Sequence, residues 1–363
     1  MNLITLKFAR VVVPVVCALA VLASAAPSRA QQPSPRLPRH IDERTMAAIK
    51  RGLDYLAQTQ RNDGSWMSAG GYGSYPAVMT SLAGLALLSS GSTPTEGPYS
   101  RNIRKAMEYL MNISDERTGL LAGPGSEGRS VYGHGFGMLF LSECYGMERG
   151  AETRKKLKTI LDKAIALSVS AQSSYENDTA GGWYYTLQKG GDEGSTTVTQ
   201  IQGLRAARNA GMKVPPEVIR KAAKYLAICQ NPDGGISYSY SSRGGSRPPI
   251  SAAAVATLYA AGKYDDAMAV NCLEYVTKTV VPELNHHSGH GHWFYTHFYM
   301  AQAMYQVHDA RYDRYFPVLR DNLLKLQAGD GSWTGDGVGT VYGTGIACIV
   351  LQLPFDYLPI FQR

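Results

Sequence analysis

Two pairs of polar side chains stand at the start of apolar segments, where they could carry out acid–base chemistry. Asp192 and Glu193 come directly before one such segment, and Tyr132 and His134 open another. A carboxyl group in an apolar cavity has its pKa raised by desolvation and can serve as a general acid. For Glu193 the simpler alternative is helix capping, in which Ser195 caps a helix and the helix dipole favours the acids before it. Tyr132 and His134 also suit an acid and a base that act on a polysaccharide.

Aromatic side chains gather at the same kind of position, and most of them are tyrosines. The chain has 23 tyrosines and only 8 phenylalanines. The face of an aromatic ring stabilises a cation, stacks on a sugar ring or covers an apolar ligand. Packing within loops is the alternative use for any single one of them. The further side chains that we expect at a binding cavity are Tyr72, Tyr75, Trp183, Tyr238, Tyr240, Trp293, Tyr295, His297 and Tyr342.

A group of histidines invites a metal-binding interpretation. It consists of His286, His287, His290, His292 and His297, and histidine-rich tracts can bind zinc or copper. No acidic residue or cysteine stands in register with them, and the tract contains glycine. We therefore favour a surface cluster without a bound metal, and the sequence indicates no cofactor.

The cysteine spacing and the charge exclude other classes of site. Cys144, Cys229, Cys272 and Cys348 are separated by 85, 43 and 76 residues, which matches neither zinc nor redox motifs. Buried thiols are expected, with a disulfide as the alternative in an oxidising compartment. The formal net charge of +7 falls to +4 without the first 30 residues, which gives no case for a nucleic-acid partner.

The N-terminal residues are typical of an export signal. A basic start is followed by an apolar run over 11–22 and then by small residues. This pattern predicts a signal peptide over 1–30 and a periplasmic or secreted protein, with an uncleaved anchor as the alternative. Residues 31–40 contain three prolines and are typical of a linker, so a single domain is expected over 41–363.

The remainder of the sequence repeats itself. The segment Val131–Leu141 reappears as Val341–Leu351, at an offset of 210 residues, or four steps of a little over 50. Similarity at one step length indicates an architecture of stacked units. Complete or reduced copies of a motif Gln-x-x-Asp-Gly-Ser-Trp lie at Gln60–Trp66, Gln172–Trp183, Gln230–Gly235 and Gln327–Trp333.

Each unit pairs an amphipathic helix, which is apolar on one face, with a helix that is apolar on nearly all sides. Leu157 and Leu161 belong to a stripe at helical spacing, whereas 252–261 is apolar on nearly every side and must be buried on every side. Six such pairs predict two concentric layers closed into a ring, with an open solenoid as the alternative. In a ring, His134 and His297 would face each other across the centre. Outer helices are predicted near 44–60, 101–112, 154–171, 216–229, 266–278 and 317–327, and inner helices near 76–90, 134–146, 196–210, 249–261, 294–307 and 341–352.

The glutamine that ends a helix before Asp-Gly-Ser-Trp resembles the QW repeat of squalene and oxidosqualene cyclases and of protein prenyltransferase β-subunits. In that family the glutamine amide ties to the start of the next helix and the tryptophan ring stacks over it. The resemblance covers 41–363 and implies an all-α fold, an α/α toroid of about six helix hairpins in two concentric layers. The segments 131–136, 203–211 and 358–363 further resemble an exported bacterial branch of the family that has no settled reaction.

The residues that perform chemistry in these relatives are absent here. Neither the Asp-x-Asp-Asp acid motif of hopene-forming cyclases nor the Asp-Cys-Thr-Ala-Glu motif of oxidosqualene cyclases occurs. Alignment on Gln302 places Tyr295, His297 and Gly343 where prenyltransferases have the Asp, Cys and His ligands of zinc. The zinc site is therefore not carried over.

Three functions are compatible with this pattern. We favour an exported toroid whose aromatic cavity binds an apolar, isoprenoid-like ligand, with Glu193 or Asp192 as the acid of a terpene-cyclase-like reaction. The alternatives are a non-catalytic binding or scaffold module and a carbohydrate-active toroid that uses Tyr132 and His134. The apolar ending over 351–361 is expected to close the ring, with contact to a membrane surface as the alternative.

Overall fold

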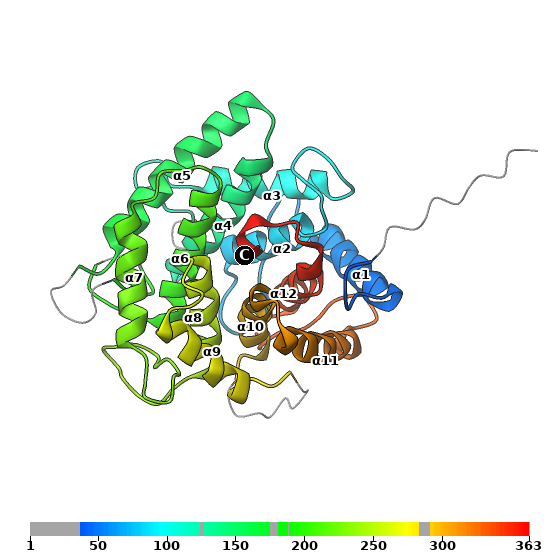
Figure 1. Ribbon diagram of the computed structural model, residues 1–363. Helices are drawn as coiled ribbons and strands as arrows, with labels where there is room; N and C mark the ends of the chain where they lie inside the picture. Colours follow the sequence, from blue (N-terminus) through cyan, green and yellow to red (C-terminus); the bar gives the residue numbers. More distant parts are fainter. Residues whose placement is uncertain (1–36, 124–126, 175–180, 188, 283–290, 363) are drawn as a thin grey trace, which may run out of the picture. The chain divides into compact units, whose positions relative to one another are not determined.

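Twelve helices alternate between an outer and an inner layer in the part of the chain that the structure describes (Figure 1). The structure is a computed structural model, and it describes residues 37–123, 127–174, 181–187, 189–282 and 291–362. The outer helices are α1 (Glu43–Thr59), α3 (Ser100–Ile113), α5 (Ala151–Ala171), α7 (Pro216–Ile228), α9 (Ala267–Thr279) and α11 (Ala310–Leu326). The inner helices are α2 (Pro76–Leu88), α4 (Ser130–Met147), α6 (Gly194–Asn209), α8 (Pro248–Ala260), α10 (Trp293–Val307) and α12 (Thr340–Gln352).

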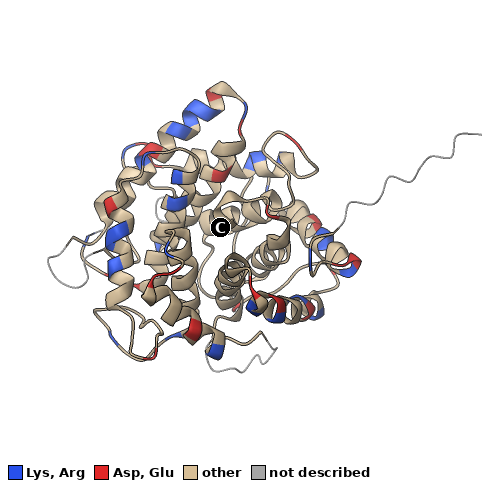
Figure 2. Ribbon diagram, viewed as in Figure 1, with Lys and Arg blue, Asp and Glu red and all other residues tan. Residues whose placement is uncertain are grey.

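The inner helices close into a ring. Each packs against the inner helix of the next repeat, and α12 packs against α2. Every residue of α2 and of α8 is buried, whereas outer helices such as α1 bury a single face. Charged side chains accordingly lie mostly on the outer helices and loops (Figure 2). The predicted α/α toroid is confirmed, because a helix without a polar face is stable only when other helices surround it.

Glutamines of the repeated motif fasten neighbouring repeats to each other. The side-chain amide of Gln60 donates to Gly64 O in its own loop and to Asn102 O near the start of α3, both at 2.9 Å. Three other glutamines likewise donate to a backbone carbonyl near the start of the next outer helix: Gln172 to Val218, Gln230 to Met268 and Gln327 to Ala48. The bond from Gln327 to Ala48 joins the sixth repeat to the first.

The tryptophan of the motif is held between the two layers. Trp66 donates its ring N–H to Leu56 O of α1 at 2.9 Å and its backbone N–H to the Thr80 hydroxyl of α2 at 3.0 Å. Trp183 and Trp333 make the same two kinds of bond in their own repeats. Each of these tryptophans therefore joins an outer helix to the inner helix of its own repeat.

The chain ends over the inner ring (Figure 1). Two short 3-10 turns, η1 (Leu353–Phe355) and η2 (Pro359–Phe361), follow α12, and η2 contacts α6. Gln306 of α10 donates to Phe361 O at 3.2 Å. The apolar ending thus packs on the inner helices near their C-terminal ends. Among the described residues no helix is long and apolar enough to cross a membrane.

One helix boundary differs clearly from its prediction. An outer helix was predicted near 317–327, but α11 begins at Ala310 and contains Pro317 in its interior. A proline there removes one backbone hydrogen bond. The rings of Tyr312 and Phe316, which are buried and stacked 5.1 Å apart, hold the extra turns against the fold and offset that loss.

Candidate functional site

A central cavity of about 310 Å³ lies inside the ring. All six inner helices contribute side chains from their first turns, so the cavity lies at the end of the ring where these helices begin. The C-terminal segment covers the other end. Much of the wall is apolar and is formed by Val78, Leu82, Phe136, Ile250, Phe298 and Ile346.

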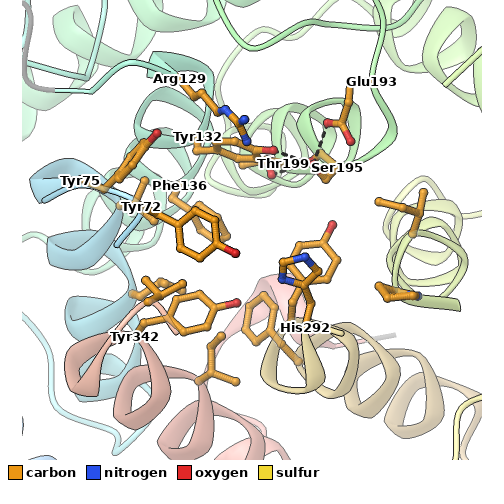
Figure 3. A pocket seen from close by; sticks show the side chains of 18 of the residues that line it. Tyr72, Tyr75, Arg129, Tyr132, Phe136, Glu193, Ser195, Thr199, His292 and Tyr342 are labelled. Atoms are coloured by element: carbon orange, nitrogen blue, oxygen red, sulfur yellow. Dashed lines mark hydrogen bonds between the residues drawn. The ribbon is translucent and has the colours of Figure 1, made fainter. Parts of the chain in front are cut away.

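Tyrosines form much of the rest of the wall. Among the described residues seven tyrosines line the cavity, and all but Tyr185 had been singled out from the sequence. Figure 3 shows the rings of Tyr72 and Tyr342 directed into the space between the helices. The hydroxyl of Tyr295 is buried and has no hydrogen-bond partner among the described residues. The cavity therefore offers a ligand several aromatic faces. The other predicted tyrosines that line it are Tyr75, Tyr132 and Tyr238.

Tyr75 is held in an unusual backbone conformation at the start of α2. Its φ of 39° and ψ of 56° lie in the left-handed region. For a residue other than glycine this costs roughly 1–3 kcal/mol and persists only where the surroundings impose it. This backbone conformation sets the direction in which the Tyr75 side chain leaves the backbone, and the side chain lines the cavity.

Glu193 is the only acidic side chain among the described residues that line the cavity. It is 1% exposed, and its Oε2 accepts from Thr196 N–H at 2.8 Å and from the Ser195 hydroxyl at 2.6 Å. Its Oε1 has no partner in the described structure, and burial raises the pKa of the carboxyl group. The Tyr132 hydroxyl lies 2.7 Å from Ser195 Oγ and extends this chain of hydrogen bonds (Figure 3). Glu193 itself caps α6; the predicted cap was Ser195, whose hydroxyl instead donates to the carboxyl group.

Asp192 lies outside the cavity lining and holds a loop. It is 2% exposed, and its Oδ2 accepts from the Tyr225 hydroxyl at 2.8 Å and from Tyr240 N–H at 2.6 Å. These bonds tie the loop before α8 to the outer helix α7. Asp192 and Tyr240, both predicted at the cavity, therefore have structural roles in the fourth repeat.

His134 lies between the layers, so it does not form the predicted acid–base pair with Tyr132. Its Nδ1 accepts from Leu121 N–H at 3.2 Å, and its Nε2 donates to Ala164 O of α5 at 3.0 Å. Burial lowers the pKa of the imidazole to about 4, so the ring is neutral. In the first repeat the Thr80 hydroxyl of the inner helix accepts a hydrogen bond from the backbone N–H of Trp66 in the preceding loop. His134 has the same role in the second repeat, where it accepts from the backbone N–H of Leu121.

His297, Trp183 and Trp293 are also absent from the cavity lining, contrary to prediction. His297 bonds the Tyr315 hydroxyl of α11 at 2.7 Å, and burial lowers its pKa to about 3. His134 and His297 therefore both contact outer helices and do not face each other across the ring. Trp183 is fully buried between the layers, and Trp293 packs its ring 4.5 Å from that of His297.

Two arginines line the cavity and were missed in the sequence, Arg129 and Arg247. The guanidinium of Arg129 lies 4.2 Å from the ring centre of Tyr185, and that of Arg247 lies 5.7 Å from the ring centre of Tyr238. The hydroxyls of the two tyrosines contact each other. The signal that could have revealed them is their place directly before α4 and α8, since first turns of inner helices border the cavity.

Metal ligands do not converge in the described part of the chain. No group of three His, Cys, Asp or Glu side chains there could hold a metal ion. His292 lines the cavity, whereas His286, His287 and His290 lie outside the described residues. Cys144, Cys229, Cys272 and Cys348 are buried as free thiols.

No protein-family model and no curated protein matches the chain. Solved structures do resemble it. A type II terpene cyclase from Scytonema, in complex with geranylgeranyl dihydroxybenzoate, has a TM-score of 0.58 at 14% identity over 87% of this chain and 98% of that one. An α-1,6-mannanase from Salegentibacter sp. HEL1_6, in complex with α-1,6-mannotriose, has a TM-score of 0.60 at 8% identity, with coverage of 85% and 98%. A cellobiose 2-epimerase from Bacillus thermoamylovorans B4167 has a TM-score of 0.57 at 11% identity, with coverage of 84% and 98%.

These three similarities concern the fold alone. The enzymes catalyse unrelated reactions on one architecture, so the architecture does not select among them. Taken with the ring of helices, they show that the chain has the α/α toroid fold shared by terpene cyclase-like and glycoside-processing proteins.

Proposed function

We propose that this chain is an exported protein of the squalene cyclase and prenyltransferase repeat family whose cavity binds an apolar, isoprenoid-like ligand. The observation that carries the proposal is the cavity, in which apolar and aromatic walls from six helices surround the buried Glu193. The glutamine bonds between repeats support the family assignment, because they tie each loop to the next outer helix. The proposal includes a signal peptide over 1–30, a linker over 31–40 and a toroid domain over 41–363.

The size and lining of the cavity suit a branched hydrocarbon chain. Its volume of about 310 Å³ lies at the lower end of the roughly 300–1,000 Å³ that is typical of small-molecule sites. Burial of apolar ligand surface against such walls contributes about 25 cal/mol per Å². The hydroxyls of Ser195 and Thr199 already donate to Glu193 and to a backbone carbonyl, so they offer a sugar few new bonds.

We further propose that Glu193 protonates a carbon–carbon double bond of the ligand. A raised pKa favours the neutral acid, which is the form that donates a proton. The acid O–H bond breaks while the π electrons form a C–H bond, which leaves a carboxylate on Glu193 and a carbocation on the ligand. Tyrosine faces around the cavity would stabilise that cation. Transfer of a proton from a neighbouring carbon to the Tyr132 hydroxyl breaks a C–H bond, forms a new double bond and ends the reaction. The Tyr132 hydroxyl passes its own proton to Ser195, and Ser195 passes its proton to the Glu193 carboxylate, which is an acid again.

A carbohydrate-active toroid is the second candidate. The tyrosine-rich wall and the similarity to a mannanase and an epimerase favour it. Glycosidases typically use two carboxyl groups, however, and Glu193 is alone among the described cavity residues in carrying one. A carbohydrate-active enzyme could instead use Tyr132 and His134 as its acid and base. Both ring nitrogens of His134, however, form hydrogen bonds to backbone groups between the layers and not at the cavity. An apolar ligand is therefore better supported.

The test is mass spectrometry of small molecules that copurify with the exported protein, followed by binding of geranylgeraniol to the purified chain. We expect an isoprenoid to copurify and geranylgeraniol to raise the melting temperature. Ile346→Trp places a larger side chain in the cavity and should abolish binding. Thr159→Trp, on the exposed side of α5, should leave binding unchanged. Circular dichroism establishes that both variants are folded. A copurified oligosaccharide, or binding that Ile346→Trp leaves unchanged, would overturn the proposal.

The same protein preparation separates binding from catalysis. Conversion of a bound polyene to an isomer supports Glu193 as an acid, whereas tight binding without conversion supports the non-catalytic module. N-terminal sequencing of the exported chain tests whether cleavage occurs near residue 30.

A further inference from the structure

Carboxyl groups cap every second inner helix at the cavity end of the ring; two of them are buried and that of Asp336 is half-buried. Glu127 accepts from the backbone of α2 at 2.7 Å, Glu193 caps α6, and Asp336 accepts from the backbone of α10 at 3.0 Å. The helices α4 and α8 lie between these three in the ring. Their N-cap residues are Arg129 and Arg247, and neither side chain forms a capping hydrogen bond.

An arginine has the unfavourable charge for such a position. The start of a helix carries a partial positive charge, which stabilises anions and destabilises cations. Arg129 and Arg247 are exposed at the cavity, and neither forms an ion pair with an acidic side chain among the described residues, unlike Arg104, which pairs with Glu148. Two helix starts and two unpaired guanidinium groups thus concentrate positive charge there.

Aromatic rings hold both guanidinium groups in place. Arg129 lies over Tyr185 and Arg247 near Tyr238, and the contact between the two phenol hydroxyls joins the pairs. Burial raises the pKa of Tyr238, while the charges of both arginines act to lower it, so both lie near this one ring. The two arginines therefore border a shared space at the edge of the cavity, and we name them the cationic rim.

We infer that the cationic rim binds the oxyanion head group of an amphipathic ligand whose apolar part fills the cavity. Guanidinium groups bond carboxylate and phosphate oxygens through parallel N–H donors. Tyr295, whose hydroxyl has no hydrogen-bond partner among the described residues, lines the same cavity. The inference rests on the proposed apolar ligand and narrows it, because a plain hydrocarbon would leave both guanidinium groups unpaired.

Three ligands with one chain and different heads provide the test: geranylgeranyl monophosphate, geranylgeranoic acid and geranylgeraniol. The two anions should bind the wild-type chain about tenfold or more tightly than the alcohol, because hydrogen bonds to charged groups contribute on that scale. Added salt should weaken binding of the anions and leave the alcohol unaffected, because the rim is exposed.

Variants assign this preference to particular residues. Replacing both Arg129 and Arg247 by alanine should remove the preference for the anions over the alcohol, and replacing both by lysine should restore part of it. The matched control is Arg243→Ala, since Arg243 is an exposed arginine that lies near Tyr240 and does not line the cavity. It should bind all three ligands as the wild-type chain does.

Each contrary outcome identifies which idea fails. Equal affinity for the anions and the alcohol, or a preference that survives in the double alanine variant, would refute the cationic rim and leave the apolar cavity standing. Inorganic phosphate that binds as tightly as the prenyl phosphate would also refute the amphipathic ligand, since the rim would then be a site for free phosphate. Failure of all three prenyl ligands to bind would overturn the proposed function and this inference with it.

Discussion

Glu143 gives a quantitative test of how much it costs to ionise a carboxyl group that is buried in the ring. It lies in α4 with 5% of its surface exposed, and the backbone N–H of Ile360 in the C-terminal segment bonds it. Burial raises the pKa of its carboxyl group from 4.5 to about 7. We predict that Glu143→Gln stabilises the protein above neutral pH and has no such benefit in acid.

The sign and size follow from the two pKa values. Below pH 4.5 the carboxyl is protonated in the folded and the unfolded chain, so it adds no pH dependence. As the pH rises from there to about 7, the unfolded chain releases the proton first, and the free energy of unfolding falls by about 1.4 kcal/mol per pH unit. The loss totals roughly 3 kcal/mol above that range, and Glu143→Gln avoids it because glutamine does not ionise.

Urea denaturation followed by circular dichroism, from about pH 4 to about pH 8, measures the effect as a difference between the variant and the wild-type chain. That difference should shift in favour of Glu143→Gln by about 3 kcal/mol across the range. Glu108→Gln, at an exposed position in the middle of α3, is the control and should change this difference far less. A flat difference for Glu143→Gln would refute the assignment of a raised pKa to burial in the ring.

Three further predictions concern the proton relay and the closure of the ring. Glu193→Gln should abolish product formation while the melting temperature stays near that of the wild type, since the glutamine oxygen still accepts from Thr196; unchanged turnover would remove Glu193 as the acid. Tyr132→Phe removes the hydroxyl that bonds Ser195 and should lower kcat while the Kd for the ligand stays constant; a raised Kd would indicate a binding role instead. Gln327→Ala breaks the bond between the sixth and first repeats and should lower the free energy of unfolding in urea by about 1–3 kcal/mol, and an unchanged midpoint would contradict its closing role.

The fold could be predicted almost in full because the local sequence of each repeat is sufficient to predict its two helices. The helix ends lie within about four residues of their predicted places, apart from the start of α11. That start was missed because Pro317 looks like a helix boundary, while the packing that holds the preceding turns comes from rings such as Tyr312 that contact other repeats.

The site was predicted in part, and the errors have a common cause. Glu193 and most of the tyrosines proposed from the sequence line the cavity, and most of these lie near the starts of inner helices. Asp192 and His134 stand at equally suggestive positions, but their partners belong to other segments, namely Tyr225 of α7 and Ala164 of α5. A side chain near an inner helix faces either the cavity or the outer layer, and the local sequence looks the same in both cases.

The sequence by itself determined the ring: its repeat length, its two kinds of helix and the glutamines and tryptophans that fasten them. Only the tertiary structure decided which polar groups meet. It placed Arg129 and Arg247 near one another at the cavity although more than a hundred residues separate them, and it left one oxygen of Glu193 unpaired inside. The physical reason is that helix formation depends on neighbours along the chain, whereas charge, burial and hydrogen bonding at the cavity depend on neighbours in space.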